Sequence, residues 1–112
     1  MDSNIRERLR DIYESITSIE DYLGAERDFD VYMINKMLRR AIERELEIIG
    51  EAMNRIDKKV PDIPISSKRQ IVGMRNRLIH GYYKIDNVMI WGVINRHLPV
   101  LEEEVSRILY EP

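Results

Sequence analysis

The sequence contains no cysteine, and its 112 residues include only 5 glycines, 4 prolines and a single tryptophan. Without cysteine there is neither a disulfide framework nor a thiolate metal site, which is typical of a reducing compartment. The apolar runs are a few residues long, too short to span a membrane, and the N-terminal MDSNIRER lacks the apolar core of a signal peptide. We therefore expect a cytoplasmic protein with no membrane association.

The residues that are abundant favour helices. Apolar residues make up 44% of the chain and charged residues 34%, with Glu, Arg, Ile and Leu prominent among them. A chain of this length is typical of one domain with one modest core. We expect a single helical domain over residues 1–112.

Apolar periodicity predicts two long helices in the first half of the chain. The first helix should end at Gly24, because apolar residues recur before it at spacings of 4, 3, 4, 3 and 4. A second, longer helix should begin at an N-cap supplied by Asp28 or Asp30 and run to about Ile56. It is apolar over so much of its girth that it must bury more than one face, in the core or against a second chain. The apolar positions of the first helix are Ile5, Leu9, Ile12, Ile16, Ile19 and Leu23.

The second half contains a proline-bearing loop and shorter helices. Residues 57–64, with two prolines, predict the main loop. A third helix should start at the capping box of Ser67 and Gln70 and end at Gly81. Asp86 should cap a fourth helix, and Pro99 fits the first turn of a fifth that ends near residue 110. With no strand alternation, the prediction is an all-α, up-and-down bundle of four to five helices.

The distribution of charge is uneven although the net charge is only −2. Residues 63–85 contain five basic residues and no acidic one, whereas the other 89 residues hold 13 basic and 20 acidic residues, a net charge of −7. Such a basic window attracts a polyanion, or alternatively forms an ordinary solvated helix face.

The segment RNRLIHGYY (75–83) within this window carries the candidate chemistry. Arg75 offers a planar fork suited to phosphate oxygens, and His80 exchanges protons near neutral pH. On a regular helix the two lie about 140° apart. Either His80, next to Gly81, leaves the helical path, or the site combines residues from two chains. A dimer would supply two histidines, as base and acid for attack by an RNA 2′-OH, and two arginines for the transition-state charge. We find no ligand cluster for a metal.

The order Arg75-x4-His80-Gly81-Tyr82 matches the R-x4-H-x-Y signature of the HEPN superfamily, and specifically resembles the HepT branch of bacterial and archaeal toxin–antitoxin pairs. The resemblance extends to "IERELEIIGEA" (42–52), "VGMRNRLIHGYYKID" (72–86) and "IW" (90–91), and covers nearly the whole chain.

The resemblance implies a helical, homodimeric endoribonuclease toxin that needs neither metal nor cofactor. Arg75 and His80 would be catalytic, with Asn76 as a supporting polar group. The family's partner is a minimal nucleotidyltransferase antitoxin of the MntA type, which in part of the family transfers AMP to the motif tyrosine, here Tyr82. The bulky anion would block an RNA-binding cleft. The alternatives are a non-catalytic module that binds nucleic acid or the nucleotidyltransferase, and a purely structural helical dimer.

The remaining polar and aromatic residues have less specific interpretations. Trp91 is expected to be a core or interface anchor, and His97 to be structural. Glu47 and Glu51 are expected to provide surface or interface polarity. Packing or solvation is an equal alternative for the last two of the RNA-binding candidates, which are Lys68, Arg69, Arg77, Tyr83 and Lys84.

Overall fold

The computed structural model describes residues 2–25, 27–80 and 85–110, which form helices and no strand. None of these helices is both long and apolar enough to cross a membrane. Because the last three elements follow one another without interruption, the described residues form five helical rods, and the all-α prediction is confirmed. The elements are α1 (Ser3–Leu23), α2 (Phe29–Ile34), α3 (Lys36–Lys59), α4 (Lys68–His80), α5 (Asn87–Gly92), the π-helical η2 (Val93–His97) and α6 (Leu98–Tyr110).

Helix α1 ends where the sequence predicts. The Asp2 side chain caps it by accepting the Asn4 N–H at 2.7 Å. Gly24 ends it with a φ of 71°, a left-handed conformation that favours glycine, and donates its N–H to the Glu20 carbonyl at 3.0 Å. The predicted apolar stripe, up to Ile19, is buried in the core.

The predicted second helix is in fact two helices, with a break at Asn35. Asp28 caps α2 as predicted, but Asn35 is extended (φ −100°, ψ 93°) and its side chain caps α3 by accepting the Leu38 N–H at 3.0 Å. The break is not visible in the sequence, because the apolar pattern continues on both sides of Asn35. Ile34 and Met37, which flank Asn35, are 84% and 82% exposed. Helix α3 also continues to Lys59, so the loop begins later than predicted.

The predicted fourth and fifth helices form one continuous rod. Asp86 caps its start as expected, accepting the Met89 N–H at 3.0 Å. The predicted helix with Pro99 in its first turn and its end near residue 110 is α6 (Leu98–Tyr110). No loop precedes it, because the backbone stays helical through the wider turn of η2, where the Leu98 N–H bonds to the Val93 carbonyl. Proline has no N–H and its ring crowds the carbonyl four residues earlier. A π-turn just before it lets the helix pass.

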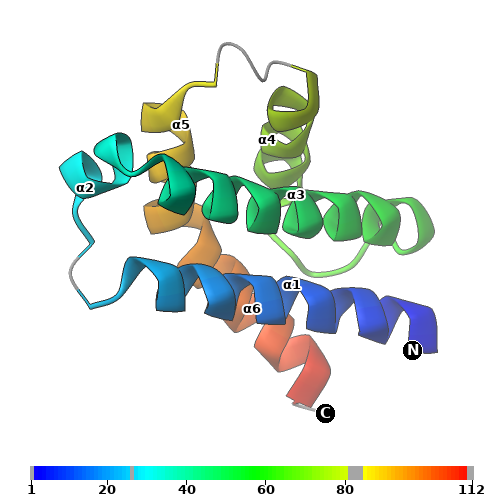
Figure 1. Cartoon of the computed structure of the whole chain (residues 1–112). Coiled ribbons are helices and arrows are strands. Elements are labelled where there is room, and N and C mark those ends of the chain that lie inside the picture. Colours follow the sequence, from blue (N-terminus) through cyan, green and yellow to red (C-terminus); the bar gives the residue numbers. More distant parts are fainter. Residues whose placement is uncertain (1, 26, 81–84, 111–112) are drawn as a thin grey trace.

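Figure 1 shows α1 and α3 packed side by side and antiparallel, with α6 behind α1 and α4 projecting from α3. Helix α4 packs on α3 and η2, and its buried side chains join the core.

The segment before α4 is held in place by the Glu104 carboxylate, which accepts the Ser66 N–H and hydroxyl at 3.1 Å. The predicted capping box is not formed, because the buried Ser67 hydroxyl has no partner among the described residues. Packing and this tether, rather than a cap, position α4.

Candidate functional site

Helix α4 carries both candidate catalytic residues, and it remains α-helical through His80. Of the two alternatives, the one in which His80 leaves the helical path is therefore wrong. Because α4 is helical through His80, Arg75 and His80 lie about 140° apart around its axis. His80 is exposed at the end of the helix. Gly81, Tyr82, Tyr83 and Lys84 lie outside the described residues.

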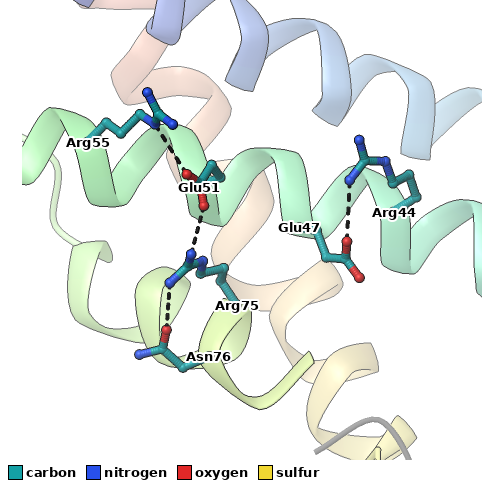
Figure 2. A network of polar contacts seen from close by, with 6 residues as sticks. All are labelled: Arg44, Glu47, Glu51, Arg55, Arg75 and Asn76. Atoms are coloured by element: carbon teal, nitrogen blue, oxygen red, sulfur yellow. Dashed lines mark hydrogen bonds and ion pairs between the residues drawn. The ribbon is translucent and has the colours of Figure 1, made fainter. Parts of the chain in front are cut away.

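Arg75 is held in a polar network between α4 and α3, shown in Figure 2. Its Nη2 donates to Glu51 Oε2 at 2.7 Å, and its Nη1 donates to Asn76 Oδ1 at 3.0 Å. Arg55 donates to the other Glu51 oxygen at 3.2 Å. Hydrogen bonds from Arg55 and then Arg75 lower the pKa of Glu51 below its ordinary value of 4.5, although the carboxylate remains close to solvent. The network thus brings together Arg75 and Asn76, two of the predicted site residues, and fixes the direction of the guanidinium.

The backbones of α3 and α4 approach closely at the same point. A Cβ built on Gly50 would overlap the Cβ and Cγ of Arg75, so no larger residue fits there without movement of a helix. The Arg75 side chain is only 22% exposed, and its Nε is buried without a partner among the described residues. Arg75 is therefore oriented from two sides, by packing on Gly50 and by the ion pair with Glu51.

The opposite face of α4 presents a second set of basic residues. Arg69, Gly73, Arg77 and His80 follow one another at spacings of 4, 4 and 3, which places them along one stripe of the helix. Arg69 and Arg77 line a cleft of about 540 Å³ between α4 and the α5–η2 segment. No acidic residue is among the described residues that line it. His80 therefore shares its face with Arg69 and Arg77 and not with Arg75.

The basic window of the sequence is partly neutralised in space. Lys68 forms an ion pair with Asp57 at 3.0 Å and also donates to the Pro61 carbonyl. Glu51 compensates Arg75 in the same way, since both carboxylates come from α3. Within the described part of the window, the predicted RNA-binding candidates that have no ion-pair partner are Arg69 and Arg77.

Sequence reasoning missed four residues that the structure places near these groups. Glu51, interpreted as surface or interface polarity, orients Arg75 across a sequence separation of 24 residues. His97, interpreted as structural, lines the cleft together with Arg96. The proximity of Gly50 and Glu51 to the helix that carries Arg75 has no local sequence signal. By contrast, Trp91 is an aromatic anchor as expected, with ring centroids 5.5 Å from Phe29 and 5.2 Å from Tyr32.

Within residues 2–25, 27–80 and 85–110, no three His, Asp or Glu side chains are grouped closely enough to hold a metal ion. The described site thus consists of arginines, an asparagine, a glutamate and one exposed histidine. Such a set can bind phosphate and transfer a proton.

Comparison with known proteins gives consistent similarities. Residues 12–108 match the family model "Ribonuclease HepT-like". The chain is 35% identical to "Putative RNase MJ1380" of Methanocaldococcus jannaschii over 92% of this chain and 94% of that protein. It is 32% identical to "Probable ribonuclease HepT" of Thermococcus cleftensis over the same shares, and 31% identical to "Putative RNase MJ0125" of M. jannaschii over 88% and 87%. No solved structure matches the chain.

Proposed function

The chain belongs to the ribonuclease HepT-like family, and we propose that it is an endoribonuclease that cleaves RNA without a metal ion through Arg75 and His80. The observation that carries this proposal is the family match over residues 12–108, which includes the whole of α4. The arrangement of α4 supports it, since an oriented guanidinium and an exposed imidazole occur within five residues. An arginine held in place stabilises charge without reorganisation cost.

The reaction needs a base and an acid. A histidine accepts the proton of the 2′-OH as its oxygen attacks the adjacent phosphorus, the bond to the 5′ oxygen breaks, and a second group protonates that oxygen. The products are a 2′,3′-cyclic phosphate and a free 5′-OH. Because Arg75 and His80 lie on different faces of α4, one chain cannot direct both at one phosphate. We propose a two-fold homodimer in which each chain contributes a histidine and an arginine to a shared cleft.

We further propose that the protein is the toxin of a two-component pair and that its partner is an MntA-type nucleotidyltransferase. The tyrosine oxygen of Tyr82 would attack the α-phosphate of ATP and release pyrophosphate, which leaves AMP on the side chain. Tyr82 is two residues from His80, so the added phosphate would compensate nearby arginine charge and exclude RNA. Intact-mass spectra after co-expression should show one or more AMP additions that are absent from Tyr82→Phe. An adduct retained by Tyr82→Phe would contradict this assignment.

The test of the nuclease is His80→Ala. We expect cleavage of a labelled RNA to fall at least about a hundredfold, because general acid–base catalysis contributes about 10² to 10⁴. Arg10→Gln is the matched control, since Arg10 is an exposed residue of α1 with no role in the proposed site. Thermal unfolding followed by circular dichroism shows whether each variant is folded.

Persistent wild-type cleavage by folded His80→Ala would contradict the catalytic assignment. A wild-type protein that binds RNA and never yields 2′,3′-cyclic phosphate ends would instead identify a non-catalytic binding module.

A further inference from the structure

We propose that the cleft between α4 and the α5–η2 segment is a binding subsite for one nucleotide of single-stranded RNA, with Arg69, Arg77 and Arg96 on its phosphate. The subsite lies on the face of α4 that carries His80, away from the Arg75 network. The proposal deepens the nuclease function proposed above and rests on it for the identity of the strand.

Among the described residues, most arginines that lack a partner within the chain lie at this cleft. Of the 13 arginines in the sequence, nine form a hydrogen bond or an ion pair with a carboxylate, an amide or a carbonyl within the chain. Among the described residues, no such partner occurs for the other four. One of these is Arg10 on α1, and the remaining three, Arg69, Arg77 and Arg96, all line this cleft. Three exposed like charges held around one concavity repel one another, and a phosphate removes that repulsion.

The floor of the cleft suits the other half of a nucleotide. Met74 and Val93 are only 2% and 6% exposed, and Met89 lies beside them. A Cβ added at Gly73 or Gly92 would meet nothing within 4 Å, so the wall is open at both glycines. An apolar, unobstructed floor below a basic rim matches a flat base joined to an anionic phosphate. The volume of about 540 Å³ falls in the range of small-ligand pockets, which is about 300–1,000 Å³.

The π-helical turn η2 contributes two consecutive residues to the cleft. The exposed Arg96 and the half-buried His97 both line this cavity. Both belong to η2, where the turn is widened ahead of Pro99. Single π-turns within α-helices occur frequently at functional sites. Here the widened turn adds a cation and an imidazole to the wall that faces α4.

The position of the cleft relates it to the proposed chemistry. The stripe Arg69–Gly73–Arg77–His80 extends along α4 for about 16 Å, at a rise of about 1.5 Å per residue. Arg77 is three residues from His80, so a nucleotide whose phosphate contacts Arg77 lies next to the proposed catalytic imidazole. The cleft therefore holds a nucleotide that neighbours the cleaved bond and thereby sets the register of the strand.

The experiment measures binding in the His80→Ala background, so that the RNA is not consumed. Fluorescence anisotropy with a labelled single-stranded 12-nucleotide RNA compares His80→Ala alone with the same protein carrying Arg69→Gln, Arg77→Gln and Arg96→Gln. We expect the triple change to weaken binding at least about tenfold and to reduce the slope of log K against log salt by about 0.7, since the one phosphate that the subsite neutralises on a single strand contributes about 0.7. Arg10→Gln, the other arginine without a partner, should leave both quantities unchanged. The altered arginines are exposed, so the fold should be retained, which the unfolding midpoint verifies.

Three results would overturn the proposal. The first is a triple variant that keeps the wild-type affinity and salt slope. The second is free AMP that binds as tightly as the RNA with the same dependence on the three arginines, which would assign the cleft to a free nucleotide. The third is a change of oligomeric state in the triple variant, measured by light scattering, which would make the cleft a contact between two copies of the chain.

The outcomes also separate this inference from the nuclease function. Cleavage that depends on His80 but not on the three arginines would leave the nuclease in place and remove the subsite. If RNA binding depends on the three arginines but the protein never cleaves RNA, the subsite would stand and the nuclease function would be excluded.

Discussion

The two faces of α4 carry arginines only two residues apart in opposite states. Arg75 is 22% exposed, contacts Gly50, and donates to Glu51 and Asn76. Arg77 is exposed, and no acceptor for it occurs among the described residues. In the sequence the two are equivalent positive charges in one acid-free window. The structure separates a guanidinium whose direction is fixed from one that is available to a ligand.

This difference suits two tasks. A transition state requires donors that already point at the developing charge, because reorganising them during the reaction costs free energy. Binding a flexible strand requires charges that adjust to it and are not already neutralised. The Arg75 face meets the first requirement and the Arg77 face the second. Variants that affect one face and not the other therefore test the distinction.

The largest expected effect is on activity, and it comes from replacing the fixed arginine by lysine. Arg75→Lys keeps the charge but cannot bridge Glu51 and Asn76, because an ammonium lacks the planar fork. We expect kcat/KM on a labelled RNA to fall about a hundredfold, the loss typical of a misplaced group. Arg77→Lys should lower it less than about fivefold, since a point charge is sufficient for a phosphate contact. Equal losses of kcat/KM in the two variants would contradict the distinction between a fixed arginine on one face of α4 and an adjustable one on the other.

The next effect is on stability, and it tests the contact that orients Arg75. Gly50→Ala places a methyl group where the Arg75 Cβ and Cγ already lie, so α3 and α4 must separate. Overpacking of this kind costs about 1–3 kcal/mol. Urea denaturation should therefore show a lower free energy of unfolding, with an unchanged slope against denaturant.

Gly73→Ala is the matched control on the other face. Its Cβ would meet nothing within 4 Å, and alanine is the better helix former by up to about 1 kcal/mol. The same substitution should therefore stabilise the protein at residue 73 and destabilise it at residue 50. A Gly50→Ala variant as stable as the wild type would show that α3 and α4 can move apart there without loss of stability.

The parts of the fold that depend on local pattern were predictable. The apolar spacing and Gly24 define α1, and Asp28 and Asp86 cap helices as residues of their type do. The break at Asn35 was not predictable, because asparagine is tolerated within helices and the apolar stripe continues on both sides of it. Pro99 correctly indicated the start of the last helix, but the absence of a loop before it was not predictable, since proline fits the first turn of a helix in either case. Only the widened turn of η2 distinguishes the two cases, and it has no sequence signal.

In the candidate site, too, local features were predictable and contacts between helices were not. The segment around Arg75 and His80 was identified from residue type and motif, and so were Arg69 and Arg77. What depends on contacts between elements was not. Glu51 compensates Arg75 from another helix, and Arg96 reaches the cleft from η2. Charge counted along the chain therefore overestimated the free positive charge near Arg75 and Lys68 and omitted that of Arg96.

The smallest expected effect is the pH dependence of the network on the Arg75 face. Because hydrogen bonds from Arg55 and Arg75 lower the pKa of Glu51 in the folded protein, its ionised form favours folding above the ordinary value of 4.5. That contribution is lost as the pH falls through the lowered folded pKa. The carboxylate is exposed and therefore screened, so Glu51→Gln should cost less than about 1 kcal/mol at neutral pH, and the difference from wild type should vanish in acid.

Urea denaturation of both proteins between pH 7 and pH 3 measures the difference between wild type and Glu51→Gln. Glu47→Gln provides the comparison, because Glu47 lies one turn away on α3 and contacts Arg44 at 3.4 Å but no residue of the network (Figure 2). A Glu51→Gln difference that stays constant with pH would mean that Glu51 holds Arg75 by shape and hydrogen bonding rather than by charge. The fixed face of α4 would then owe its order to Gly50 and the packing of the two helices.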